Sequence, residues 1–162
     1  MNVYTTDRIR NVVLLGHGGC GKTSLVEAMA YLAGLTTRMG TVADKNTISD
    51  FDKEETKRQF SIHTSVVAIP WKDSKINVLD TPGYFDFVGE VEEAVSAADA
   101  AIIVISGKAG IETGTRRAWE ICEKNHYSSF PSLCRICSLI AVHSEELLKK
   151  TLSRFCAERW ER

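Results

Sequence analysis

The chain has 162 residues, 44% hydrophobic and 25% charged, which is typical of one globular domain with a substantial core. Its 20 basic and 21 acidic residues give a formal net charge of −1, which excludes a global basic field for holding nucleic acid. No apolar run is long enough to span a membrane and the N-terminus lacks a signal layout, so we expect a soluble, cytoplasmic protein.

An eight-residue glycine-rich segment follows the first predicted strand. Residues 1–10 are expected to form a loose lead-in and Asn11–Leu15 a buried strand. A helical apolar pattern then runs from Lys22 to Ala33, ending before Gly34. Between them every fixed position of Gly-x-x-x-x-Gly-Lys-Ser/Thr is matched, by Gly16, His17, Gly18, Gly19, Cys20, Gly21, Lys22 and Thr23. The strand-loop-helix setting predicts a phosphate-binding loop; the alternative is a glycine-rich turn with an exposed lysine.

The residue types of this loop suit a polyphosphate. Its glycines let the backbone take positive φ and bring N–H groups close to phosphates at the positive end of the helix. Lys22 would reach the outer phosphates, and the Thr23 hydroxyl would ligate Mg²⁺. The sequence therefore predicts nucleotide binding along residues 16–24, which include Ser24.

A polar, strongly charged connection follows from Thr36 to Phe60. It has no sustained apolar period, and a long connection of this kind is usually mobile or functional. Ile62–Ile69 and Lys75–Leu79 then predict two strands joined around Pro70–Ser74, as in a hairpin.

The second of these strands leads into Asp80, Thr81, Pro82 and Gly83. An acidic residue at the end of a buried strand, followed by a Pro-Gly break, is where nucleotide-hydrolysing sheets place a carboxylate that orients Mg²⁺. Alone, this tetrapeptide could be a simple turn. Together with the upstream loop, it favours a metal-orienting carboxylate.

The remaining pattern predicts a helix over residues 85–98, a strand over 100–105 and a helix over 113–124 with Ala118, Ile121 and Cys122 on its inner side. This order of elements predicts an α/β fold: a mostly parallel sheet with helices on both faces and the ligand at the carboxyl ends of the strands, incomplete at its C-terminal end.

These motifs resemble a known family. Residues 16–28, 80–87, 88–92 and 107–119 together look like the N-terminal GTP-binding domain of bacterial translation elongation factor G, over about Ile9 to Asn125. The resemblance implies a GTPase that binds GTP or GDP with Mg²⁺ and acts on the ribosome in translocation during protein synthesis.

The same resemblance implies roles for individual residues. Thr23 holds the metal, while Asp80 and Gly83 sense the γ-phosphate. The first switch would end near Ser61, where the family usually has threonine; a serine hydroxyl can also ligate Mg²⁺, although Ser61 could be an ordinary strand-entry residue. The implied site is thus Lys22, Gly83 and Tyr84 for catalysis, residues 16–24 and Asp80 for the nucleotide, and Thr23, Ser61 and Asp80 for the metal.

Tyr84 departs from the family pattern. The family commonly has a histidine here that positions the attacking water, and a divergent elongation-factor-G-like branch, which this chain resembles, has tyrosine. A phenol ordinarily titrates near pH ~10, so it is a poor proton acceptor at neutral pH. The tyrosine therefore bears on hydrolysis rather than on binding, and a non-hydrolysing interaction module or inactive fragment is the alternative function.

The tail, residues 126–162, is the second departure. It contains neither the Asn-Lys-x-Asp that reads guanine in the family nor the later Ser-Ala element. We expect one strand within residues 130–143 and an amphipathic helix from Ser144 to about Trp160, capped by Ser144. Our hypothesis divides the chain into a GTP-binding part, 1–125, and a divergent tail, 126–162, that is foreign or frame-shifted.

Five cysteines with irregular spacing and no secretory signal predict reduced thiols. A Cys₃His zinc site built from Cys122, His126, Cys134 and Cys137 is conceivable. Buried thiols explain the same residues, so we expect no zinc and less than stoichiometric metal in protein prepared without chelator.

Overall fold

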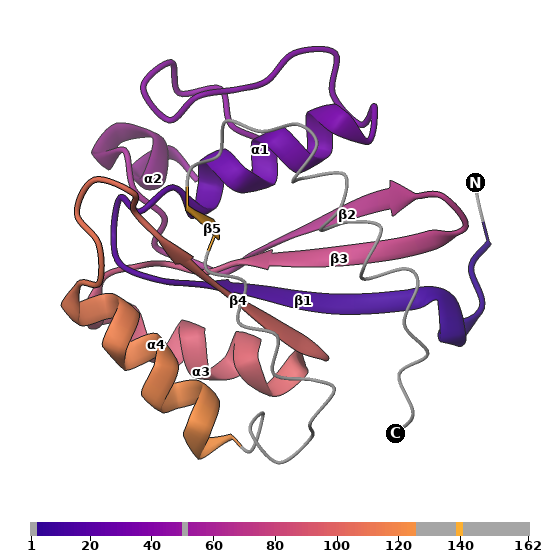
Figure 1. Cartoon of the computed structure of the whole chain (residues 1–162). Coiled ribbons are helices and arrows are strands. Elements are labelled where there is room, and N and C mark those ends of the chain that lie inside the picture. Colours follow the sequence, from indigo (N-terminus) through magenta and orange to yellow (C-terminus); the bar gives the residue numbers. More distant parts are fainter. Residues whose placement is uncertain (1–2, 50–51, 126–138, 141–162) are drawn as a thin grey trace.

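The computed structural model describes residues 3–49, 52–125 and 139–140, which form a sheet between two layers of helices (Figure 1). The elements, in chain order, are η1 (Thr6–Arg8), β1 (Ile9–Leu15), α1 (Lys22–Leu32), α2 (Lys53–Arg58), β2 (Ser65–Trp71), β3 (Ser74–Asp80), η2 (Phe85–Phe87), α3 (Val88–Ala97), β4 (Ala100–Ile105), α4 (Thr113–Lys124) and β5 (Leu139–Ile140), where η denotes a 3₁₀ turn.

The sheet is mostly parallel, as the sequence predicts. Its strand order is β2-β3-β1-β4-β5. β1 pairs in parallel with both β3 and β4, and β4 pairs in parallel with β5. The predicted hairpin is confirmed, since β2 is antiparallel to β3. Because Leu14 lies opposite Asp80, the carboxyl ends of β1 and β3 meet at one edge of the sheet.

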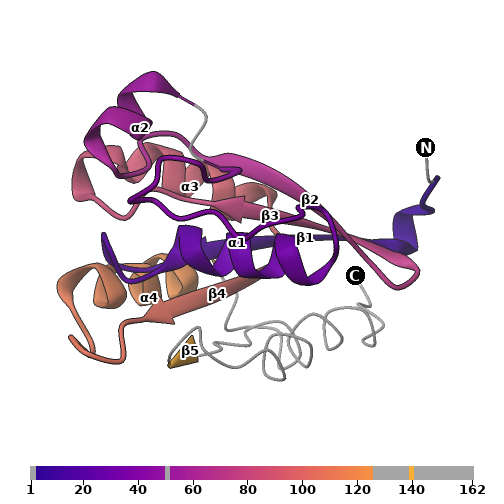
Figure 2. The same ribbon diagram turned by 90° about the horizontal axis from the view of Figure 1, so that it is seen from above.

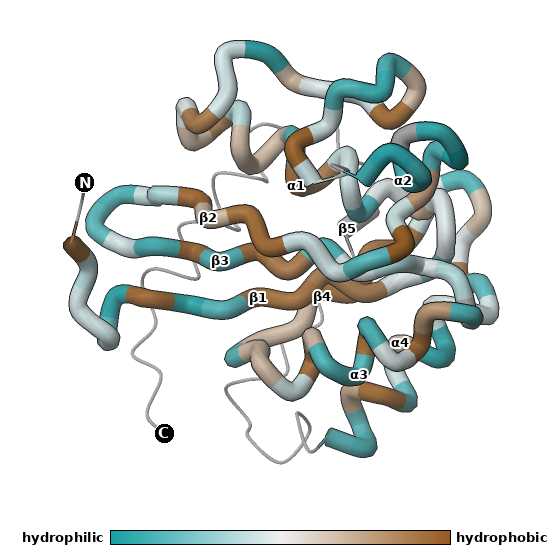
Figure 3. Tube along the Cα trace, turned by 180° about the vertical axis from the view of Figure 1, so that it is seen from behind, coloured by the Kyte–Doolittle hydropathy of each residue, from teal (hydrophilic) through white to brown (hydrophobic). Residues whose placement is uncertain are grey.

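Helices cover both faces of the sheet. α1 and α2 lie on one side, and α3 and α4 on the other (Figure 1). Alternate residues of β1 enter opposite cores: Val12 and Leu14 pack in the cluster that contains α1, whereas Val13 and Leu15 pack in the cluster that contains α3 and α4. The strands accordingly form the apolar band inside more polar helices (Figure 3).

The connection from α1 to β2 departs from the prediction. The sequence predicts no secondary structure over residues 36–60, yet they include α2. Figure 2 shows the chain running back from the end of α1 to α2, which lies beside the carboxyl ends of the strands. The Asp52 side chain accepts a hydrogen bond from the Glu54 amide, and Glu55 completes a capping box. This local capping stabilises a short helix without an apolar stripe.

The other expected boundaries shift by a few residues. β1 begins at Ile9, and α1 ends at Leu32 with Ala33 as its C-cap. β2 begins at Ser65 rather than Ile62, because the amides of residues 62–64 bond to glutamate side chains instead of a neighbouring strand. Pro70 and Trp71 belong to β2, and the helix expected from residue 85 begins as the 3₁₀ turn η2.

Most of the tail lies outside the described residues. β5 falls within the strand expected in residues 130–143, whereas the helix expected from Ser144 lies outside the described part. The division at residue 125 therefore stays a prediction. Among the described helices none has the length and apolar character needed to cross a membrane.

Candidate nucleotide and metal site

The glycine-rich loop joins the carboxyl end of β1 to the start of α1. Gly16 has φ +145°, and a Cβ on it would lie 2.5 Å from the carbonyl oxygen of Val104, so the loop can pass this close to β4 only without a side chain. Gly19 and Gly21 also have positive φ, but Gly18 does not, which corrects the expectation for all four glycines. The α1 N-terminus carries no side-chain cap, so its first N–H groups are available to an anion.

Lys22 is held against the loop that it follows. Its Nζ donates to the carbonyl oxygens of Gly16, at 3.1 Å, and His17, at 3.0 Å. The side chain is only 6% exposed. The ammonium group therefore lies within the loop, where an anion would contact it and the backbone N–H groups together.

Three oxygen-bearing side chains from distant parts of the chain meet beside Lys22. The Thr23 hydroxyl donates to Asp80 Oδ2 at 2.8 Å, and it lies 3.4 Å from the Ser61 hydroxyl. Asp80 is 1% exposed. The structure thus brings together the three residues proposed from sequence as metal ligands, from α1, the segment before β2, and the end of β3.

A cavity of about 260 Å³ opens beside this cluster. The glycine-rich loop and the start of α1 form one side, and the segment before β2 and the turn after β3 form the other. Its lining residues are Gly18, Gly19, Gly21, Lys22, Thr23, Ser24, Val42, Gln59, Phe60, Ser61, Thr81, Gly83 and Tyr84. The size is close to the lower end of small-molecule sites, about 300 Å³.

Gly83 lies directly against the glycine-rich loop. A Cβ on Gly83 would lie 2.6 Å from the Gly18 nitrogen and 2.6 Å from Lys22 Nζ. No larger residue fits without moving the turn after β3 away from the loop. This close approach suits a backbone N–H that would face the same phosphates as Lys22.

The Tyr84 ring closes one side of the cavity. A Cβ on Gly18 would lie only 3.0 Å from Tyr84 Cζ, so the absence of a side chain at Gly18 makes room for the ring. Phe60 packs against the same ring edge to face, with centroids 4.8 Å apart. Tyr84 thus joins the glycine-rich loop to the segment before β2, although it remains 45% exposed.

Two side chains of the loop turn away from the cavity. His17 Nε2 lies 3.6 Å from Glu112 Oε1, and the ring packs on Gly114 at the start of α4. Cys20 is buried, and this burial raises the pKa of its thiol despite the nearby Lys22 charge. Their contribution to a nucleotide would come from the backbone, whereas Ser24 lines the cavity.

Two glutamates that the sequence did not predict shape this site. Glu55 and Glu90 accept hydrogen bonds from the amides of Ile62, His63 and Thr64, which follow Ser61. The Thr64 amide, and to a smaller extent His63, holds the pKa of Glu90 below its ordinary value. The Asp-x-x-Glu spacing of residues 52–55 could have located Glu55, but no local signal marks Glu90.

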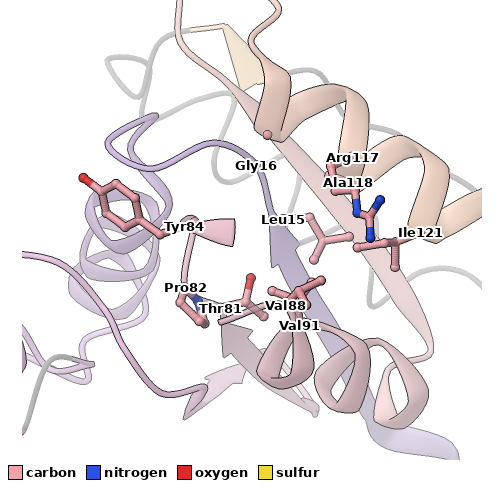
Figure 4. Close-up of a pocket in the computed structure, with 12 residues that line it drawn as sticks. Leu15, Gly16, Thr81, Pro82, Tyr84, Val88, Val91, Arg117, Ala118 and Ile121 are labelled. Carbon is pink, nitrogen blue, oxygen red and sulfur yellow. The ribbon is translucent and has the colours of Figure 1, made fainter. Parts of the chain in front are cut away.

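A second, narrow cavity of about 30 Å³ lies behind the turn after β3. Figure 4 shows Leu15 of β1, Val88 and Val91 of α3, and Ile121 of α4 around it, with the Tyr84 ring turned away. This volume suits one or two waters rather than a nucleotide.

The residues present fit a Mg²⁺-polyphosphate. Two hydroxyls and a carboxylate form a set of hard oxygen donors, which is the chemistry that Mg²⁺ prefers, while the remaining ligands are commonly phosphates and water. The glycine-rich loop and Lys22 supply the complementary donors for phosphate. In the described residues we find no group of three or more His, Cys, Asp and Glu side chains arranged for a metal, and His126, Cys134 and Cys137 lie outside them, so the zinc expectation is untested.

Comparison with protein families gives one match over most of the chain. Residues 7–156 match the elongation factor Tu GTP binding domain. The chain is 40% identical over 120 residues to mitochondrial ribosome-releasing factor 2 of Drosophila sechellia, and 40% identical over 116 residues to an elongation factor G-like protein of Mycobacterium tuberculosis. These alignments cover 74% and 72% of the chain, but only 17% and 16% of the respective relatives.

Solved structures agree with this assignment. A protein from Thermus thermophilus superimposes with a TM-score of 0.70 and 41% identity, over 73% of this chain and 18% of that one. A bacterial selenocysteine-specific elongation factor matches with a TM-score of 0.62 and 20% identity, over 90% of this chain and 22% of that one, which supports the fold alone.

Proposed function

Because this chain belongs to the family of the elongation factor Tu GTP-binding domain, we propose that it binds GTP or GDP with Mg²⁺ and hydrolyses GTP as part of an elongation-factor-G-like translational GTPase. The proposed partner is the ribosome, and the proposed role is translocation during protein synthesis. The cytoplasm remains the compartment expected from sequence, although some relatives are mitochondrial.

The convergence of Thr23, Ser61 and Asp80 beside Lys22 carries this proposal. Thr23 and Asp80 are 57 residues apart in the chain, and Thr23 and Ser61 are 38 apart. A fold that needed only a core would gain little from bringing a buried carboxylate and two hydroxyls to the mouth of a cavity. Mg²⁺ held there would neutralise charge on the phosphates.

Each residue then has a defined part in the chemistry. Lys22 and the loop amides bind and orient the phosphates, and the Gly83 N–H donates to the terminal one. Tyr84 can pack against the attacking water or donate a hydrogen bond to it, but a phenol is a weaker proton acceptor than an imidazole. Hydrolysis by the chain alone is therefore proposed to be slow.

Titration calorimetry with GTP, with and without Mg²⁺, tests the binding proposal on the 162-residue chain. Multiple-turnover phosphate release with and without ribosomes tests the reaction. Binding that depends on Mg²⁺, together with release that ribosomes accelerate, is the expected result. Binding without any turnover would favour the non-hydrolysing interaction module, which the tyrosine at position 84 also favours.

Tyr84→His should raise the rate of GTP hydrolysis while leaving nucleotide affinity nearly unchanged. The reason is that this residue would contact water in the transition state rather than the bound phosphates. Single-turnover phosphate release measures the rate and calorimetry the affinity. Tyr31→His, a similarly exposed tyrosine on α1, is the control. A flat rate in a folded, nucleotide-bound Tyr84→His variant would contradict the prediction.

We expect GTP and ATP to bind this chain weakly and with similar affinity. Asn-Lys-x-Asp is absent from residues 126–162, and charged hydrogen bonds of the kind its aspartate makes with guanine are worth about 1.5–3 kcal/mol each. The loop, Lys22 and Mg²⁺ would contact only the polyphosphate. Calorimetry with each nucleotide decides this: a GTP preference of about 100-fold, or about 2.7 kcal/mol, would show that other residues read the base.

A further inference from the structure

The three amides that follow Ser61 are all held by glutamate side chains. Glu55 Oε1 accepts hydrogen bonds from the Ile62 amide at 2.9 Å and from the His63 amide at 3.0 Å. The next amide, of Thr64, donates to Glu90 Oε2 at 2.8 Å. Because these bonds begin one residue after Ser61, they fix the backbone that orients the Ser61 hydroxyl.

Glu55 is itself held firmly. It is 1% exposed, and its Oε2 accepts from the Asp52 amide at 3.3 Å as part of the capping box of α2. A buried carboxylate is costly unless charged hydrogen bonds compensate for its lost hydration. Three backbone amides provide this compensation, so Glu55 ties α2 to the segment that carries Ser61.

Regular strand pairing does not set the position of Ser61, because β2 begins only at Ser65. The neighbouring Phe60 packs against the rings of Tyr84 and Phe87, which follow β3. The Ser61 hydroxyl lies 3.4 Å from the Thr23 hydroxyl. A slip of one residue would move the chain by about 3.8 Å and take the Ser61 hydroxyl away from this position. The bonds to Glu55 oppose such a slip.

We propose that Glu55 is a positioning residue that holds the Ser61 hydroxyl at the metal site. It acts through the Ile62 and His63 amides and touches neither metal nor nucleotide. This inference rests on the proposed binding of Mg²⁺ and nucleotide. It predicts that the affinity for Mg²⁺ depends on Glu55, but only as long as Ser61 is present to use that positioning.

A double-mutant cycle between Glu55→Ala and Ser61→Ala tests the proposal on the 162-residue chain. Calorimetry with GTP over a series of Mg²⁺ concentrations gives the Mg²⁺ affinity of the GTP complex. Mutating a residue that holds a metal ligand in place typically lowers the metal affinity by about 10–100-fold. We expect each single variant to lose about tenfold in Mg²⁺ affinity, and the double variant to lose no more affinity than either single variant.

Two further measurements separate positioning from general damage. GTP affinity in EDTA should be unchanged in Glu55→Ala, because the loop and Lys22 bind the phosphates without Ser61. The control is Glu54→Ala, which removes an exposed carboxylate of the same helix that pairs with Arg58. Its Mg²⁺ affinity should match the parent.

Glu55→Asp covers the case in which the alanine variant does not fold. It keeps the charge but withdraws the acceptor by one methylene, so it should lose less Mg²⁺ affinity than Ser61→Ala. When Ser61 is already alanine, adding Glu55→Asp should cause no further loss of Mg²⁺ affinity. Losses that multiply in the double variant, or a parent-like affinity in a folded Glu55 variant, would overturn the inference. A parent chain that binds no GTP would instead overturn the proposed function.

Discussion

Replacing Lys22 by alanine should weaken the binding of GTP and of ATP by about 100-fold, equivalent to about 2.7 kcal/mol. The ammonium group lies inside the glycine-rich loop, 3.1 Å and 3.0 Å from the carbonyl oxygens of Gly16 and His17. A charged hydrogen bond to phosphate is worth about 1.5–3 kcal/mol. Two of the three N–H donors of Lys22 bond to these carbonyls, so one remains for a phosphate. Because Lys22 would contact the phosphates and not the base, GTP and ATP should lose similar amounts of affinity.

Calorimetry in Mg²⁺ buffer measures this effect, with Lys124→Ala as the control because Lys124 is exposed at the far end of α4. A thermal melt shows whether the Lys22 variant keeps its fold, since the parent lysine also bonds to the loop. Retained nucleotide affinity in a folded Lys22→Ala chain would mean that the cavity beside the loop is not the phosphate site.

Local sequence patterns were sufficient for the centre of the site. The strand-loop-helix setting of residues 11–33 and the strand that ends at Asp80 each have a signature within a few residues. Placing Thr23 beside Asp80 needed one further step, because adjacent parallel strands bring their carboxyl ends to the same edge. The structure has both features, with Thr23 Oγ1 2.8 Å from Asp80.

The segment between α1 and β2 could not be predicted in the same way, because its contacts are not local. Glu27 of α1 accepts hydrogen bonds from the Gly40 and Ile48 amides, and Glu90 of α3 accepts from Thr64. A glutamate whose side chain accepts hydrogen bonds from distant backbone amides looks like an exposed helix residue in the sequence. Gln59, with φ +61°, is likewise an uncommon backbone state that its residue type does not announce.

Replacing Ile102 by alanine should lower the free energy of unfolding by about 2–5 kcal/mol, the usual cost of truncating a buried isoleucine. Ile102 is fully buried in β4, opposite Leu14 of β1, and belongs to the core cluster that packs against α1. Deleting three carbons there leaves a cavity that the close-packed sheet and helix cannot fill. The free energy of unfolding of native domains is about 5–15 kcal/mol, so a large share of the stability would be lost.

Ile111→Ala is the matched control, because the same side chain is 66% exposed at position 111 and should cost within about 0.5 kcal/mol. Urea unfolding followed by circular dichroism measures both variants. Equal midpoints for Ile102→Ala and Ile111→Ala would contradict the packing of α1 on the sheet.

Nucleotide should stabilise the Ile102 variant as much as it stabilises the parent chain. A ligand that binds only the native state adds RT ln(1 + [L]/Kd), about 2.7 kcal/mol at 100 times Kd, whatever the starting stability. Ile102 lies in the core, whereas the cavity is lined by the glycine-rich loop and the turn after β3, so its truncation should leave Kd unchanged. GTP with Mg²⁺ should then raise both unfolding midpoints by similar free energies. A much smaller gain in the variant would mean that the core beneath β4 also sets the shape of the nucleotide site, through the close approach of Gly16 to the Val104 carbonyl.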